Sequence, residues 1–289
     1  MSDNRTVTSH QWLLVFLAAV GCVVLVLPGT VSAEFTPIKH SDFQAVDDNG
    51  MTAWGTSGYH PVEMVGVIIN NPWDMLNYET GFRQWQVYFQ ALSGTGDFGG
   101  TAMYTNQAVV TPGDWSRVMQ SLNYPKVFAG DPVTDPLRYG DVVRVQATRP
   151  GMFFRGKMNI NSGHQQYDPP QNMYDKFPFT IEILGRDLTP SVADITLAHL
   201  KDINNDFIFD ETRLTGCEHY QASLVHLTSL TLASGTWGLN QDVIVRQGEL
   251  TMPMRLGLDP GLISDDILAR VTSGSPFNLT AILDQEDTS

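Results

Sequence analysis

The chain has 289 residues, of which 42% are hydrophobic and 17% are charged, and its formal net charge is −14. This length allows two modest domains or one large β-structure, and the apolar content predicts a packed core rather than disorder. The acidic balance argues against a partner held by its phosphates, because Lys and Arg side chains supply most of the affinity for nucleic acid.

The N-terminal segment has the pattern of an export signal. Arg5 lies in a short polar head, an apolar run extends from Trp12 to Leu27, and Val31-Ser32-Ala33 fits the small-x-small rule for cleavage before Glu34. We therefore predict a signal peptide over residues 1–33, a secreted, periplasmic or cell-surface protein, and no stable membrane span after cleavage. An uncleaved anchor is the alternative, because the apolar run is nearly long enough to span a membrane.

Cleavage would leave one cysteine, Cys217, so no internal disulfide is expected and the fold must depend on its core. We interpret Cys217 as a small buried apolar residue rather than a reactive nucleophile.

The stretch from Arg138 to Asn161, RYGDVVRVQATRPGMFFRGKMNIN, carries the strongest pattern in the chain. Tyr139-Gly140-Asp141 opens a run with apolar residues at every second position, Arg149-Pro150-Gly151 interrupts it, and a second alternating run follows. Period-two alternation bounded by Gly and Pro predicts a half-buried β-hairpin.

Three strands and a helix are predicted before this hairpin. The strands are His60–Asn70, with Gly66 suited to a bulge or a close backbone approach, Gln84–Leu92 and Gly99–Thr105, and the helix is Trp115–Leu122, capped by Asp114. Three strands, a short helix and two strands are the order of an OB-fold, a five-stranded barrel.

The second half of the chain is predicted to repeat this unit in shorter form. Strands are expected over residues 221–232, 243–246, 250–256 and 277–283, with a helix near 267–271, whereas no segment follows to supply a fifth strand. Phe177–Leu184 is a further strand that could fill the open edge. The predicted domains are an extension over 34–59 with one short strand, a first barrel over 60–185, a linker over 186–216 with a short helix around Ala193–Leu200, and a second barrel over 217–289.

The runs VEMVGVI, WQVYFQA, GGTAMYT and YGDVVRVQATRPGMFFRGKMNI resemble the OB-like domains of exported bacterial proteins, some of which accompany secreted nucleases or phosphoesterases. Together with TGCEHYQASLVHL and FNLTAILDQED, they are similar to tandem OB-fold proteins of planctomycete type. The resemblance covers about two thirds of the chain. It implies an all-β protein of two OB-fold-like antiparallel barrels that acts as a binding module, and it brings no catalytic motif.

The first candidate site is the face of the barrel across its second and third strands, where OB-folds bind ligands. Amides, one tyrosine and several cations in this set suit an oligosaccharide, a polar peptide or a single strand of nucleic acid. The plainer interpretation is that they are ordinary solvent-facing positions of alternating strands. The candidate ligand-binding residues are Gln86, Tyr88, Gln90, Arg144, Arg155, Lys157 and Asn159.

The second candidate site is a calcium loop formed by Asp202, Asn204, Asp206 and Asp210, which stand at positions one, three, five and nine of an EF-hand-like spacing. Phe207 replaces the glycine of the sharp turn, and Arg213 replaces the bidentate glutamate at position twelve. A plain acidic linker is therefore the alternative to calcium, and no other cofactor is expected.

The histidines show no metal-binding or catalytic spacing, and the sequence has no nucleophile elbow, phosphate loop or dinucleotide fingerprint. We predict a non-catalytic exported binding or structural module whose ligand is an oligosaccharide or a protein. Two alternatives remain open: an OB protein that binds single-stranded nucleic acid, and a metal-dependent hydrolase fragment or phosphodiesterase-associated domain.

Overall fold

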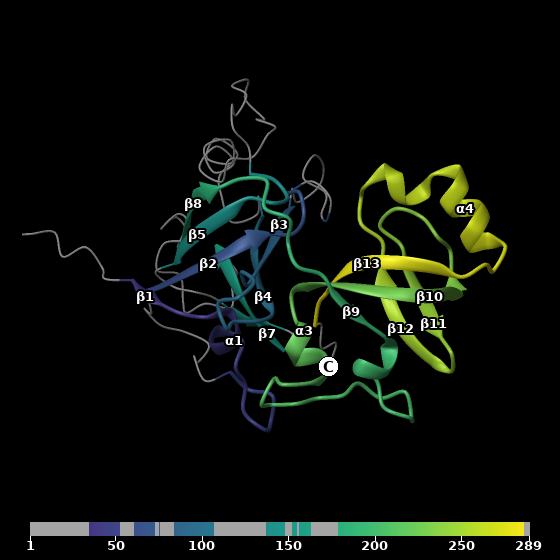
Figure 1. The fold of residues 1–289 in the computed structure, drawn as a ribbon, viewed down its shortest axis with the longest axis horizontal. Helices are drawn as coiled ribbons and strands as arrows, with labels where there is room; N and C mark the ends of the chain where they lie inside the picture. Colours follow the sequence, from purple (N-terminus) through teal and green to yellow (C-terminus); the bar gives the residue numbers. More distant parts are fainter. Residues whose placement is uncertain are drawn as a thin grey trace, which may run out of the picture. The chain divides into compact units, whose positions relative to one another are not determined.

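Two β-sheets contain most of the regular secondary structure, and the few helices are short (Figure 1). The computed structural model describes residues 35–52, 61–72, 75, 84–106, 137–147, 152–154, 156–162 and 179–285. Residues 33–289 form one compact unit. The predicted signal segment and the helix predicted at Trp115–Leu122 lie outside the described residues. Among the described helices, none has the length and apolar character needed to cross a membrane.

The first sheet has the strand order β6-β7-β4-β3-β2-β5-β8, with β1 beside β2. Neighbouring strands are antiparallel, except that β1 runs parallel to β2 and β4 runs parallel to β7. The strands are β1 (Thr36–Pro37), β2 (Val62–Ile68), β3 (Gln84–Gln90), β4 (Gly100–Asn106), β5 (Val142–Ala147), β6 (Met152–Phe154), β7 (Lys157–Ser162) and β8 (Phe179–Gly185), and α1 (His40–Phe43) follows β1.

Alternation of side chains builds the core of the first sheet. Trp85, Val87 and Phe89 of β3 point to one side and are fully buried, together with Val143 and Val145 of β5. Gly66 allows β2 to approach β3, because a Cβ atom at this position would lie 2.6 Å from the Gln90 carbonyl oxygen. The close backbone approach predicted for Gly66 is therefore confirmed.

The second sheet has the order β12-β11-β10-β13, with β9 paired in parallel to β10. Ser229 adopts a positive φ of 57° where the register of β10 against β13 shifts, so a bulge bends the long central strand. The strands are β9 (Ala193–Ile195), β10 (Ser223–Gly235), β11 (Asp242–Gln247), β12 (Leu250–Arg255) and β13 (Phe277–Leu283), accompanied by η2 (Leu197–His199), α3 (Gly216–Tyr220), η3 (Pro260–Ile263) and α4 (Asp265–Thr272).

Both sheets contain the same four-strand order. The segment β5-β2-β3-β4 of the first sheet corresponds to β13-β10-β11-β12 of the second, and a short parallel strand, β1 or β9, lies beside the first long strand of each. In each set, the strand that comes last in the chain lies at one side, followed across the sheet by the first, second and third strands in chain order. The repeat predicted from the order of elements is thus present as a shared topology.

The loop that follows the short parallel strand is also repeated. Asp47 Oδ1 accepts hydrogen bonds from the backbone N–H groups of Asn49 and Met51, both at 2.9 Å, and Asp202 Oδ1 accepts them from Asn204 and Asp206, also at 2.9 Å. Each loop is closed by an isolated bridge, Val46 with Thr52 and Lys201 with Phe207. Gly50 and Asn205 occupy the corresponding positive-φ position, which Gly and Asn adopt most readily.

Three features of the sequence-based fold differ from the structure. No closed barrel occurs in the described residues, because the first sheet ends at β6 and β8 and the second at β12 and β13. The two strands of the predicted hairpin are not partners: β5 pairs with β2 and β8, whereas β7 pairs with β4 and β6. The short helix predicted around Ala193–Leu200 is limited to the 3-10 helix η2 (Leu197–His199), whereas Ala193–Ile195 form the strand β9; Ile195 and Leu197 pack into the core of the second sheet.

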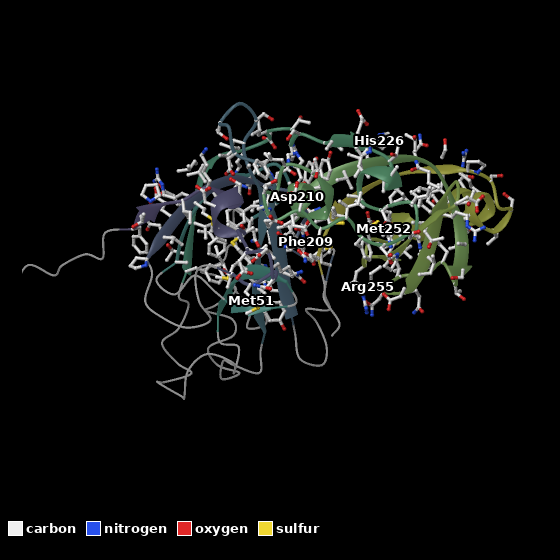
Figure 2. All side chains as sticks on the ribbon, turned by 90° about the horizontal axis from the view of Figure 1, so that it is seen from below. Met51, Phe209, Asp210, His226, Met252 and Arg255 are labelled. Atoms are coloured by element: carbon white, nitrogen blue, oxygen red, sulfur yellow. The ribbon has the colours of Figure 1, made fainter. Side chains whose placement is uncertain are left out.

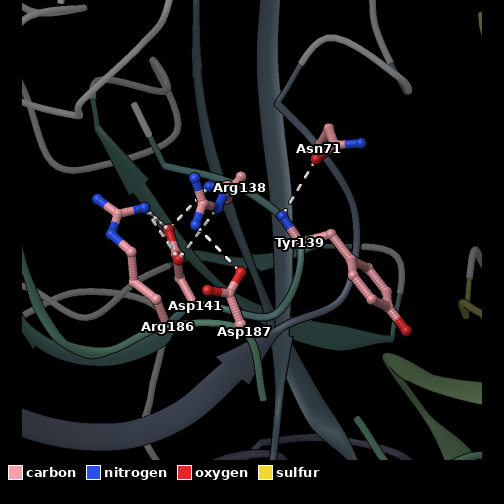
Figure 3. A network of polar contacts seen from close by, with 6 residues as sticks. All are labelled: Asn71, Arg138, Tyr139, Asp141, Arg186 and Asp187. Carbon is pink, nitrogen blue, oxygen red and sulfur yellow. Dashed lines mark hydrogen bonds and ion pairs between the residues drawn. The ribbon is translucent and has the colours of Figure 1, made fainter. Parts of the chain in front are cut away.

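A buried carboxylate fixes the turn that begins β5 (Figure 3). Both oxygens of Asp141, which is fully buried, lie 3.0 Å from Arg186 Nη1, and the Arg138 N–H donates to Oδ2 at 2.9 Å. The Arg138 guanidinium reaches Asp187 at 3.1 Å on the exposed side. A buried carboxylate is tolerated when it is paired and hydrogen-bonded in this way. The Gly-Asp pair of the sequence pattern is thus a structural element that ties β5 to the segment after β8.

Candidate functional site

The predicted ligand-binding face of β3 is covered by the second sheet. Tyr88 and Gln90 are buried, and the outer side of β2 and β3 packs against the start of β10 in a small apolar cluster that includes Val67, Ala222 and Leu224. We call this contact the sheet junction; its polar members are Tyr88, Gln90, Lys157, Gln221, Asp284 and Gln285. At the junction a Cβ atom on Gly100 would lie 2.1 Å from the Ala222 carbonyl oxygen, so the two backbones touch.

Asp284 is the centre of the polar contacts at the sheet junction. Its Oδ2 atom accepts a hydrogen bond from the Tyr88 hydroxyl at 2.7 Å and forms an ion pair with the Lys157 ammonium group. Gln86 Nε2 donates to the same Tyr88 hydroxyl at 2.7 Å. Two of the predicted ligand-binding side chains, Tyr88 and Lys157, therefore bind a residue that follows β13 of the same chain, and a third, Gln86, binds the Tyr88 hydroxyl.

Further hydrogen bonds cross the junction from Gln90 and Gln221. The Leu224 N–H donates to Gln90 Oε1 at 2.9 Å, and the Gly100 N–H donates to the Gln221 carbonyl at 2.8 Å. Gln221 Oε1 in turn accepts from Arg213 Nη1 at 2.9 Å. Burial lowers the pKa of Arg213 to about 10, partly offset by the charges of Glu218 and Asp97, so it remains a cation at neutral pH.

The remaining predicted residues of this face are spread apart. Asn159 is buried beside Lys157, and its Nδ2 atom lies 3.5 Å from the Lys157 carbonyl oxygen. Arg144 lies on β5, where it is paired with Glu63 at 3.3 Å and Glu182 at 2.7 Å. Arg155 lies outside the described residues. The structure thus brings Gln86, Tyr88 and Lys157 together around Asp284, and it does not bring Arg144 to them.

The predicted calcium loop is held by hydrogen bonds within the loop. Asp210 accepts from the backbone and hydroxyl of Thr212 through Oδ1 and from those of Thr215 through Oδ2, and these bonds lower its pKa to about 2. Asp202 is bonded to Asn204 and Asp206 as described above. A cluster of three or more His, Cys, Asp or Glu residues able to hold a metal is absent from the described residues. These bonds organise the loop without a cation, and calcium binding by these residues stays a prediction.

Cys217 and His40 are in environments that suppress reactivity. Burial, followed by the charge of Glu218, raises the pKa of the Cys217 thiol to about 12, and its Sγ atom lies 3.4 Å from the Leu200 carbonyl oxygen. Burial lowers the pKa of His40 to about 4 against the opposing charge of Asp97, and His40 Nδ1 lies 2.9 Å from Thr101 Oγ1. At neutral pH the described chain therefore holds a neutral thiol and a neutral imidazole at these positions.

One segment presents a set of exposed apolar side chains that the sequence analysis missed. We call residues 203–214 the apolar loop. Within it the exposed fraction is 95% for Ile203, 53% for Phe207, 44% for Phe209 and 70% for Leu214, and Met51, on the matching loop of the first sheet, is 51% exposed. Phe209, Asp210 and Met51 are labelled in Figure 2. The sequence signal for this exposed segment was the mixture of Ile and Phe with Asp and Asn in residues 202–210. The sequence analysis interpreted the Asp and Asn residues as calcium ligands and did not consider the apolar residues between them.

The apolar loop is held in one conformation. Asp202 and Asp210 accept the backbone hydrogen bonds described above, Lys201 Nζ donates to the Asn205 carbonyl at 2.8 Å, and the same ammonium lies 3.5 Å from the centroid of the Phe207 ring. Glu218 of α3 accepts from the Asp210 N–H at 3.0 Å, and burial raises the pKa of Glu218. Exposed apolar side chains on a fixed loop are suited to binding, because little conformational entropy is lost on contact.

Removing the Lys157 ammonium is expected to destabilise the protein much more than removing an exposed cation. Lys157→Met leaves Asp284 partly buried without its cation, and we expect the free energy of unfolding to fall by roughly 2–3 kcal/mol. Arg255→Met is the matched control, because the Arg255–Asp242 pair is 59% and 76% exposed and should contribute less than about 1 kcal/mol. Urea unfolding of the two variants measures the difference, and equal losses would contradict a stabilising junction.

His40 is expected to make the stability depend on pH. Its folded-state pKa of about 4 lies below the ordinary value of 6.5, so the unfolded chain takes up a proton between these pH values and the folded chain does not. Stability is therefore lost as pH falls below 6.5, by about 2 kcal/mol at pH 5 from this group. Urea unfolding of His40→Gln from pH 7.5 to 4.5 should show a shallower loss than the wild type; an unchanged pH profile would exclude this role of His40.

Comparison with known proteins found no matching family model, no matching curated protein and no matching solved structure.

Proposed function

We propose that this chain is a non-catalytic, exported binding module built from two OB-like units, and that it binds a protein partner through the apolar loop. The observation that carries the proposal is the exposure of Ile203 and Leu214, at 95% and 70%, on a loop fixed by its own hydrogen bonds. Exposed apolar groups that are grouped together mark interaction sites in soluble proteins.

The strand order supports an OB-like architecture for both units. In an OB-fold the first strand lies between the second and the fourth, and the fifth pairs with the third. The first sheet has this arrangement with β2, β3, β4, β5 and β7 as the five strands. The second sheet has the first four, with α4 between the third and fourth. Both units are open in the described residues, and they are joined at the sheet junction rather than by a flexible linker.

The chemistry of the apolar loop favours a protein over an oligosaccharide or a nucleic acid. Sugar rings need a free aromatic face and neighbouring polar groups, whereas one face of Phe207 is occupied by the Lys201 ammonium. The amides and tyrosine predicted to bind sugar are used at the sheet junction. Single-stranded nucleic acid needs a cationic path along its phosphate backbone, which a net charge of −14 opposes. Aliphatic side chains such as Ile203 and Leu214 instead suit an apolar protein surface.

The proposal is of a non-catalytic role, and it is supported by three nucleophile or base candidates among the described residues that are already engaged. Cys217 has a pKa of about 12, His40 is buried and bonded to Thr101, and Asp210 uses both oxygens on Thr212 and Thr215. An exported location follows from the proposed signal segment, and cleavage of that segment would leave one cysteine, which cannot form an internal disulfide. A purely structural role at the cell surface is the remaining possibility of the same class.

Site-specific photo-crosslinking tests this proposal. A photoreactive phenylalanine analogue at position 203 or 214 is expected to form one discrete adduct with a protein of the exported fraction, whereas the same analogue at Leu188 or Val192, which are 43% and 41% exposed outside the loop, should form none. Ile203→Ser and Leu214→Ser should each weaken binding of the identified protein about tenfold and leave the unfolding free energy within about 0.5 kcal/mol of wild type.

A different ligand class would give a different result. Binding to a glycan array that both serine variants retain would contradict the protein-binding proposal. Binding to single-stranded nucleic acid with a steep salt dependence would favour the nucleic-acid alternative. Phosphodiesterase activity that requires calcium would contradict the non-catalytic assignment.

A further inference from the structure

The two outer strands of the second sheet differ in whether their free edge can accept another strand. In the described residues β12 pairs only with β11, and β13 pairs only with β10 (Figure 1). An unpaired edge presents a row of N–H and C=O groups to other strands, and proteins usually protect such an edge with Pro, charges or a covering loop.

The edge of β12 is protected in two ways. The N–H of Leu256 donates to the Gln241 carbonyl at 2.9 Å, so the alternate residues Thr251 and Pro253 direct their backbone groups away from β11. The outward N–H of Thr251 is bound by Asn205 Oδ1 at 2.8 Å. Pro253 has no N–H to offer. Another strand therefore has little to pair with along β12.

Neither of the two devices that protect β12 is present at the edge of β13 in the part of the chain that the structure describes. The Leu283 carbonyl accepts from the Ala222 N–H at 2.6 Å, so Leu283 and Ala281 direct their backbone groups to β10, and Asn278, Thr280 and Ile282 direct theirs outward. The strand contains neither a proline nor a charged residue. The side chains of Asn278 and Thr280 are exposed. This edge is therefore competent to accept an antiparallel strand.

The corresponding edge in the first sheet is occupied. β5 holds the position there that β13 holds in the second sheet, and β8 pairs antiparallel along the outer side of β5, from Ala147 opposite Phe179 to Val142 opposite Gly185. β8 (FTIEILG) and β13 (FNLTAIL) share an alternating apolar pattern that begins with Phe. A strand with the sequence pattern of β13 therefore resembles β8, the strand that pairs with the corresponding edge in the first sheet.

We propose that β13 pairs with the β13 of a second copy of this chain, antiparallel and about a two-fold axis centred on Thr280. Because the strand is uncharged, the symmetric pairing places no like charges opposite each other. A two-fold axis makes each backbone contact of this pairing twice.

Sedimentation of the purified full chain over a range of concentrations tests this pairing. The wild type is expected to form a dimer, and Thr280→Pro, which removes only an outward N–H, should weaken dimerisation at least about tenfold because one hydrogen bond is lost in each copy. Thr280→Val is the matched control, since it keeps the N–H and should dimerise as the wild type does. Thermal unfolding of the monomeric forms should be the same for both variants.

Disulfide crosslinking tests the register. Cα atoms of directly opposed residues in a hydrogen-bonded antiparallel pair lie about 5.5 Å apart, within the range of a disulfide, so Thr280→Cys should give a covalent dimer on oxidation. Asn278→Cys should give none above the wild-type background, because its own copy would lie about 13 Å away. A wild-type chain that stays monomeric, a dimer that Thr280→Pro leaves intact, or crosslinking at 278 instead of 280 would each overturn the proposal. The photo-crosslinking result at the apolar loop does not depend on this outcome.

Discussion

The contact between Asp284 and the pair formed by Tyr88 and Lys157 is the interaction on which the arrangement of the described chain depends. It joins the residue that follows β13 to β3 and β7 in the first sheet, and it uses one carboxylate oxygen for both the hydroxyl and the ammonium group. Two further hydrogen bonds cross the junction, from the Leu224 N–H to the Gln90 side chain and from the Gly100 N–H to the Gln221 carbonyl. Because such groups are costly to leave unpaired once buried, the polar contacts fix how β10 meets β3, and the apolar contacts supply most of the favourable burial.

This arrangement gives different roles to the polar face of β3 and to the exposed loops that follow β1 and β9. The polar side chains of β3 that were predicted to bind a ligand, Gln86, Tyr88 and Gln90, are used in contacts within the chain. The loops after the short parallel strands remain exposed and are made rigid by Asp47 in one unit and by Asp202 in the other. The repeated unit therefore carries the same fixed loop twice, and the second copy of the loop continues into a segment with several exposed apolar residues, from Ile203 to Leu214. The exposure of these side chains is what supports the binding role proposed for the second loop.

Short-range patterns in the sequence predicted much of the secondary structure. Strands at 60–70, 84–92, 99–105 and 277–283 were predicted within a few residues of β2, β3, β4 and β13, because alternation of apolar residues is a local property. Pairing was harder, since the partner of a strand is chosen by long-range packing. The hairpin prediction failed for this reason: β5 and β7 are close in sequence, with the short β6 between them, but each pairs with a strand from an earlier part of the chain. The candidate site failed for the same reason, because period-two alternation places Tyr88 and Gln90 on the outer face but cannot say that another sheet covers that face.

The exchange rate of the Leu224 amide hydrogen measures the sheet junction most directly, because this N–H reaches Gln90 across the contact at 2.9 Å. If the junction is stable, native-state hydrogen exchange at Leu224 should be as slow as at Val87 and Val245, which lie in the cores of the two sheets. Exchange at Leu224 as fast as at the exposed Thr212 of the loop would show that the two sheets separate readily, and it would contradict the claim that the polar face of β3 is committed within the chain.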